Sequence, residues 1–181
     1  MKKLTQAEAA ILSLLAEQPR YGYELEQIIQ ARGMRSWTEI AFSSIYYLLK
    51  KLEHAQLVAG ETSQGDGRPS RMVYNILPSG RVALQESLRT MLSVPQQRYS
   101  ALLLGMANLP LLELSEVVVA LEQYCEELRS QIGRVHQRRD EEPTLPWHIH
   151  GLFDYTETMI QAEHDWLTNY LAQIRQQLNQ A

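Results

Sequence analysis

The sequence predicts a mainly α-helical protein with one small β-hairpin, in which an N-terminal winged helix-turn-helix precedes a C-terminal antiparallel helical dimerisation domain. Two observations predict this class. Residues 1–92 hold three helical patterns, then two short β-rich segments and a further helix, an order typical of a winged helix. Residues 97–181 hold long helical patterns whose apolar residues alternate spacings of three and four, as in coiled coils. We therefore predict two domains, 1–92 and 97–181.

Charge is unevenly distributed along the 181 residues, whose formal net charge is −4. Residues 1–90 carry 11 Lys and Arg against 9 Asp and Glu, which leaves 6 against 12 for residues 91–181. A mildly basic front half fits contact with DNA, whereas the overall acidity favours a protein partner. No apolar run approaches the roughly 20 residues of a membrane span. The single cysteine, Cys125, excludes an internal disulfide and predicts a cytoplasmic protein.

The first two helices have clear start and stop signals. Thr5 and Glu8 have the spacing of a capping box, and the helix they open is expected to end near Glu17. A second helix is predicted over residues 22–31, with Gly33 as its C-terminal signal. These are the two supporting helices of a helix-turn-helix.

The third helix, predicted over residues 43–55, is the candidate recognition helix. One apolar stripe has the i, i+3, i+4, i+7 spacing and consists of Ile45, Leu48, Leu49 and Leu52. At about 100° per residue, the opposite face carries Ser43, Tyr47, Lys50 and His54, with Ser44, Tyr46 and Lys51 on its flanks. Hydroxyl, aromatic and lysine side chains suit phosphate oxygens and base edges, so we predict that this face binds DNA.

Two strands are expected after the third helix, over residues 57–62 and 72–77. Turn-forming residues separate them, and Arg68 and Arg71 add cations suited to the DNA backbone. This hairpin is the predicted wing. Ser79 is expected to cap the helix that follows.

The C-terminal half predicts a helical hairpin that pairs with a second copy. Residues 99–109 are nearly all apolar and are expected to be buried. Two helices with heptad-like seams follow, and their side chains are the predicted dimer contacts. In the first helix these are Leu114, Val118, Leu121, Leu128 and Ile132, and in the second they are Met159, Trp166, Tyr170 and Ile174.

The order of these motifs resembles the PadR family of bacterial transcriptional regulators. The matching segments cover about the first 90 residues and are 10–15, 21–25, 44–53, 67–74 and 77–80. The resemblance implies DNA binding and a C-terminal domain that mediates dimerisation. Two roles stay open for Tyr21: contact with the DNA backbone, which the resemblance implies, and packing within the domain. The family usually has Gly where this chain has Gln56, and a left-handed helix cap there would be strained. It usually has Pro at the position of Tyr47, which adds an aromatic ring to the DNA-facing side.

No catalytic motif accompanies this pattern, so we predict neither an enzyme nor a cofactor. The chain has no nucleophile elbow, phosphate-binding glycine loop or zinc-protease motif. His148 and His150 are two residues apart and would point away from each other on a helix, so no metal site is predicted. Two roles stay open for the aromatic residues Trp147, Phe153, Tyr155, Trp166 and Tyr170. Such residues more often form a simple core, and the alternative is a pocket at a dimer interface that binds a small aromatic or hydrophobic effector.

Two functions follow from the residues. The first is a DNA-binding regulator, a repressor that binds a pseudo-palindromic operator as a homodimer. The alternative is a winged-helix module that binds another protein and has lost DNA binding. The lysine and tyrosine face favours the first, and the net charge of −4 favours the second.

Overall fold

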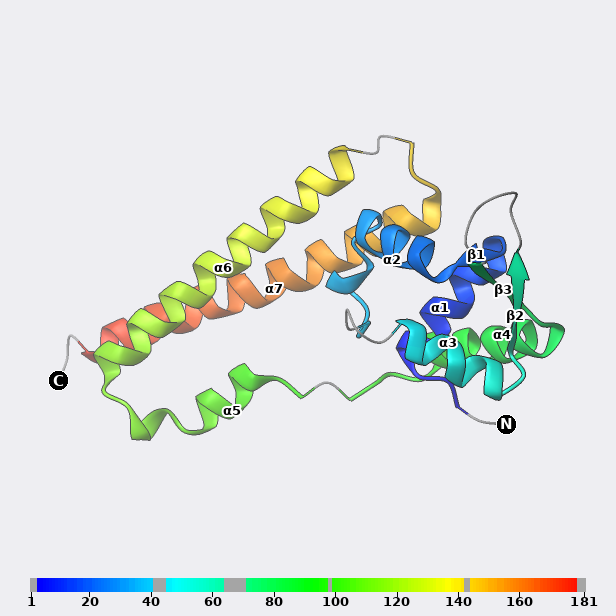
Figure 1. Ribbon diagram of the computed structural model, residues 1–181. Helices are drawn as coiled ribbons and strands as arrows, with labels where there is room; N and C mark the ends of the chain where they lie inside the picture. Colours follow the sequence, from blue (N-terminus) through cyan, green and yellow to red (C-terminus); the bar gives the residue numbers. More distant parts are fainter. Residues whose placement is uncertain (1–2, 41–44, 64–70, 98, 142–143, 179–181) are drawn as a thin grey trace. The chain divides into compact units, whose positions relative to one another are not determined.

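The computed structural model describes residues 3–40, 45–63, 71–97, 99–141 and 144–178 (Figure 1). The chain forms two compact units, residues 1–97 and residues 98–181. Within the described residues, no helix has both the length and the apolar character that crossing a membrane requires.

The first unit is a winged helix, as predicted. Its elements are α1 (Gln6–Glu17), β1 (Arg20–Tyr21), α2 (Gly22–Ala31), a 3-10 turn (Met34–Ser36), α3 (Ile45–His54), β2 (Val58–Ser63), β3 (Arg71–Ile76) and α4 (Pro78–Ser93). The strands form an antiparallel sheet in the order β1-β3-β2. The strand β1 was not predicted, because two residues are too short for an alternating pattern to appear.

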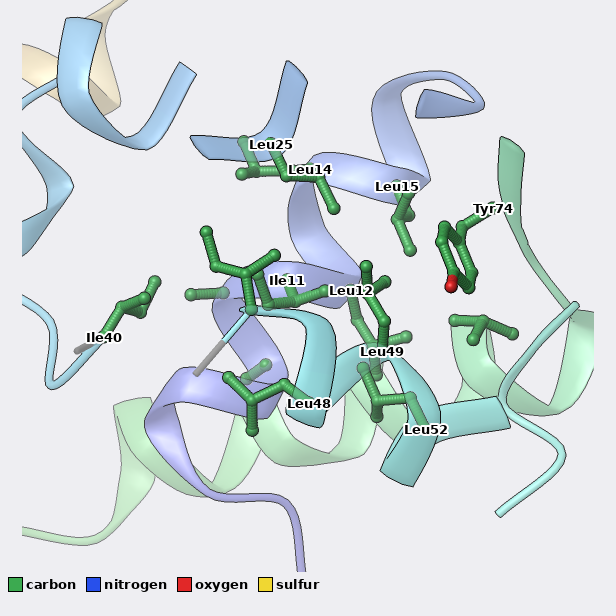
Figure 2. Close-up of a cluster of buried hydrophobic side chains, with 14 of the residues drawn as sticks. Ile11, Leu12, Leu14, Leu15, Leu25, Ile40, Leu48, Leu49, Leu52 and Tyr74 are labelled. Carbon is green, nitrogen blue, oxygen red and sulfur yellow. The ribbon is translucent and has the colours of Figure 1, made fainter. Parts of the chain in front are cut away.

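The core of this unit lies between α1, α2, α3 and the sheet. Figure 2 shows leucines and isoleucines of α1 and α3 converging with Leu25 of α2 and Tyr74 of β3. The predicted apolar stripe of α3 is confirmed, since Ile45, Leu48, Leu49 and Leu52 are all buried. Burial of each large apolar side chain stabilises the fold by roughly 1.5–3 kcal/mol, so the stripe fixes which face of α3 remains outside.

A left-handed residue ends α3. The Leu57 N–H donates to the Leu52 carbonyl and the Gln56 N–H donates to the Glu53 carbonyl, both at 2.9 Å. This is the double hydrogen bond of a Schellman motif, in which the left-handed position is usually glycine. Here that position is Gln56, with φ of 56°, the one non-glycine residue with positive φ among those described. The strain expected from the sequence is therefore present.

We expect Gln56→Gly to raise the free energy of unfolding by about 0.5–1 kcal/mol. The left-handed conformation costs a residue with a side chain roughly 1–2 kcal/mol, and glycine would relieve that strain. The greater conformational freedom of glycine in the unfolded chain cancels part of the gain in stability. Urea titration followed by circular dichroism measures the change. Gln56→Ala is the control, because it keeps the strain and should give no gain. A less stable Gln56→Gly variant would contradict the assignment.

The start of α4 packs against this same turn. An ideal Cβ atom on Gly80 would lie 2.1 Å from the Leu57 carbonyl oxygen, so only glycine fits there. The prediction that Ser79 caps α4 is wrong. The N-cap is Leu77, Pro78 is the first helical residue, and the Ser79 hydroxyl instead donates to the Gln56 carbonyl at 2.5 Å.

The second unit is a helical hairpin with a short preceding helix. It contains α5 (Ala101–Ala107), a 3-10 turn (Leu109–Leu111), α6 (Leu114–Asp140) and α7 (Trp147–Leu178), and α6 and α7 lie side by side in Figure 1. The buried core of the hairpin consists of Val117, Leu121, Cys125 and Leu128 from α6 and Leu167, Leu171 and Ile174 from α7.

The stripe of α7 predicted to contact a second copy only partly overlaps the face that packs against α6. The α7 side chains buried in the hairpin core are Leu167, Leu171 and Ile174, and Ile160 and Tyr170 pack against that core while partly buried. Tyr170 and Ile174 of the predicted stripe therefore contact the core of their own hairpin. Two neighbouring stripes of α7 share the same alternating spacing, so periodicity alone does not choose between them. The other two residues of the predicted stripe, Met159 and Trp166, are exposed beside the hairpin core.

The prediction that residues 99–109 are buried is wrong. No residue of α5 is buried, and Leu103 and Leu104 are 62% and 70% exposed. This short helix packs against the hairpin core through Leu102, and the following 3-10 turn does so through Leu109, both partly buried. An apolar helix needs more covering surface than this single chain supplies.

Candidate nucleic-acid interface

The outer face of α3 carries a row of exposed side chains. Tyr47 is 66% exposed, and Lys50 and His54 are also exposed, opposite the buried stripe. No hydrogen bond or ion pair engages Lys50 within the described part of the chain. Ser43 and Ser44, also predicted for this face, lie outside the described residues. The row therefore presents one cation, one phenol and one imidazole to a partner.

Tyr46 joins α3 to the start of α2. An ideal Cβ atom on Gly22 would lie 2.6 Å from the Cε1 atom of the Tyr46 ring, so any other residue at this position would displace the ring. The ring is still 60% exposed. Tyr46 thus has a packing role on one side, and its other side remains available to a ligand.

An open aromatic hollow lies where α2, α3 and β3 meet. Its volume is about 400 Å³, and its lining is Tyr21, Gly22, Tyr23, Tyr46, Arg71, Met72 and Tyr74. The rings of Tyr21 and Tyr23 stack with centroids 5.5 Å apart. Arg71 lies 5.4 Å from the centre of the Tyr23 ring, and its Nη1 atom donates to the Tyr23 hydroxyl at 3.4 Å. The wing cation is therefore held against the start of α2.

Sequence reasoning missed Tyr23 and Met72 in this hollow. Residues two apart do not face each other on a helix, so Tyr21 and Tyr23 gave no signal as a pair. They can stack because Tyr21 is the N-cap of α2, with an extended backbone, and only Tyr23 is helical. Met72 lines the hollow because of the way β3 pairs with the neighbouring strands. No local sequence pattern predicts that pairing.

Lys51 lies on the α1 side of the recognition helix. Its Nζ atom is 2.8 Å from Oε1 of Glu8, a carboxylate that is only 2% exposed. The hydrogen bond and charge of Glu8 raise the pKa of Lys51. The structure thus separates Lys51 from the exposed row, because neighbouring helix residues point about 100° apart. The other predicted wing cation, Arg68, lies outside the described residues.

A sequence comparison identifies the family of this region. Residues 11–86 match the Transcriptional regulator PadR-like family. This region is similar to the PadR-like family. The resemblance drawn from the sequence motifs is confirmed. No curated protein sequence shows significant similarity to the chain.

Solved PadR structures share the fold over both units. Bacillus subtilis PadR in complex with operator DNA is 19% identical, with a TM-score of 0.76 over 92% of this chain and 98% of that one. Bacillus subtilis PadR in complex with p-coumaric acid is 17% identical, with a TM-score of 0.78 over 93% and 98%. The PadR-like regulator BC1756 from Bacillus cereus is 18% identical, with a TM-score of 0.68 over 96% and 98%. The predicted fold class is therefore confirmed, helical C-terminal region included.

The predicted dimer contacts of this PadR-like chain fall into three groups. Leu121, Leu128 and Ile174 are buried inside the hairpin of their own chain. Val118, Ile132 and Tyr170 are half-buried, and Leu114, Met159 and Trp166 are exposed. Only the last two groups are accessible to a second copy, which moves the candidate interface away from the hairpin core.

The aromatic residues predicted to line an effector pocket are spread along α7. Trp147 is 85% exposed, and Trp166 stacks on Tyr170 with ring centroids 5.1 Å apart. A continuous helix rises about 1.5 Å per residue, so Trp147 and Trp166 are separated by roughly 28 Å. One chain cannot bring these two indoles into a single pocket, and an effector site stays a prediction from the sequence.

A charged cluster joins the far end of α6 to α7. The Nε2 atom of His136 lies 2.7 Å from Oε1 of Glu157, and Arg139 Nη1 lies 3.0 Å from Oε2 of the same carboxylate. The His136 hydrogen bond, followed by the charges of His136 and Arg139, lowers the pKa of Glu157 against its partial desolvation. Over the described residues, no group of three His, Cys, Asp or Glu side chains is placed to hold a metal ion.

Proposed function

We propose that this PadR-like chain is a transcriptional repressor that binds a pseudo-palindromic DNA operator as a homodimer. The observation that carries the proposal is the exposed row of Tyr47, Lys50 and His54 on α3. The buried stripe fixes this row outward, as a helix entering the major groove requires. Arg71 on the adjacent wing strand adds a cation for the DNA backbone. The match of residues 11–86 to the PadR-like family supports the same reading.

The unpartnered apolar surface of the second unit supports the homodimer. Leu103, Leu104 and Leu111 are between 62% and 81% exposed, and Met159 and Trp166 of α7 are about half exposed. Monomeric proteins rarely leave so many large apolar side chains in water. A second copy would cover them, and two-fold symmetry would then present two recognition helices to inverted half-sites.

Selection from a pool of random duplexes is expected to return an inverted repeat with half-sites about one helical turn, or a multiple of it, apart. Binding to the selected site should weaken with salt, because each phosphate contact releases counterions. Lys50→Met should lower the slope of log affinity against log salt by about 0.9 per protomer, provided that Lys50 contacts a phosphate. Filter binding at several salt concentrations measures this.

A control variant, a reporter assay and the outcome of the selection separate the proposal from its alternative. Gln30→Met changes an exposed α2 residue outside the α3 row and should leave the slope unchanged. A reporter promoter that overlaps the selected site should become more active when the protein is removed. A pool that yields no enriched inverted repeat would contradict DNA recognition and favour the protein-binding winged helix.

A further inference from the structure

Glu8 occupies a junction between two helices of the winged helix. Its Oε2 atom accepts the Thr5 N–H at 2.7 Å, which closes the capping box of α1, and its Oε1 atom lies 2.8 Å from Lys51 Nζ. Both carboxylate oxygens are therefore used, one by the first turn of α1 and one by α3. A buried carboxylate with two such partners is held in a single geometry.

Both members of this pair are charged at neutral pH. Burial by itself would raise the pKa of the Glu8 carboxyl, but hydrogen bonds from Lys51 and Thr5 and the Lys51 charge outweigh it, and the pKa is lowered. The position of Glu8 in the first turn of α1 adds a favourable interaction with the helix dipole. A charged pair in a buried setting is directional, whereas the apolar contacts of the α3 stripe are not.

Lys50 and Lys51 thus have different environments although they are neighbours. Lys50 points out with Tyr47 and His54, and Lys51 lies with its ammonium group against α1. A lysine whose charge is already neutralised by a buried carboxylate has little left to offer a phosphate. It can instead hold α3 at one rotation about its own axis.

We propose that Lys51 is a positioning residue for DNA recognition, acting with Glu8 to set the rotation of α3 so that Tyr47, Lys50 and His54 face the groove. This rests on the proposed function and adds to it a division of labour between the two lysines. Lys50 contributes phosphate affinity, and the Glu8–Lys51 pair contributes sequence discrimination without touching DNA.

The full-length protein tests this with two readouts on each variant: the salt slope on the selected operator, and the ratio of affinities for operator and random duplex. Lys51→Met and Glu8→Gln should each lower the affinity ratio about tenfold, the scale of one lost base contact, and leave the slope unchanged. The double variant should be no worse than either single one, since both remove the same interaction. Lys50→Met is the matched control and should lower the slope by about 0.9 per protomer.

Lys51→Arg keeps the charge and should restore the affinity ratio, which a loss of stability alone would not predict. If Lys51→Met loses its helical circular dichroism, Glu8→Gln and Lys51→Arg decide the question by the same two readouts. A Lys51→Met slope that falls as far as that of Lys50→Met would overturn the proposal. So would a Glu8→Gln protein with the affinity ratio of the wild type. Failure of the wild-type protein to prefer any duplex would instead refute the proposed function.

Discussion

A chain truncated after Gln97 is expected to bind a two-half-site operator at least about 100-fold more weakly than the full-length protein, while remaining folded. The first unit has its own buried core and its own sheet, so its fold does not depend on the second unit. Loss of the second unit would remove the link between two recognition helices, and such linkage typically contributes about 10²–10⁴ in affinity. Titration of labelled duplex DNA measures the loss.

A duplex that contains a single half-site provides the control for truncation. Full-length and truncated chains should bind it within a few-fold of each other, because only one recognition helix is engaged in either case. Circular dichroism of the truncated chain establishes that the winged helix is intact. Equal affinity of the two chains for the complete operator would contradict a role for residues 98–181 in pairing.

Two leucines of the second unit are expected to respond in opposite ways to a charge. Leu128 is 4% exposed in the hairpin core, so Leu128→Glu should unfold the hairpin, with a cost above the roughly 2–5 kcal/mol of a simple cavity. Leu104 is 70% exposed, so Leu104→Glu should leave each hairpin folded and dissociate the proposed dimer. Thermal unfolding and sedimentation velocity distinguish the two results.

Gln123→Glu is the matched control for this pair, since Gln123 is exposed on α6 and the substitution adds the same negative charge. It should change neither the melting temperature nor the sedimentation coefficient by much. A Leu104→Glu protein that sediments like the wild type would place α5 outside the interface. A Leu128→Glu protein that melts like the wild type would contradict the hairpin core.

The winged helix was predictable because its signals are local. The α3 stripe repeats every three to four residues, and the Thr5–Glu8 cap spans one helical turn, so a short window of sequence contains each of them. The left-handed turn at Gln56 was expected only from the family resemblance, because the family usually has Gly at this position. The exposed row on α3 follows from the same periodicity.

Features that depend on distant partners were not predictable. Lys51 and Glu8 are 43 residues apart, so helical periodicity places Lys51 on the flank of the exposed face but does not predict its ion pair with Glu8. The choice between two stripes on α7 is made by packing against α6, since both stripes have the same spacing. The exposure of α5 likewise depends on how much surface the rest of the chain offers.

The short strand β1 has a consequence for how the wing tolerates change in length. Arg20 pairs with Tyr74 and Tyr21 pairs with Val73, so β3 is hydrogen-bonded on both sides, to β1 and to β2. A residue inserted into or removed from β3 would shift both ladders at once and rotate the Tyr74 ring from the core to the surface. The length and register of residues 71–76 are therefore fixed. Natural variation in wing length has to occur elsewhere in the hairpin.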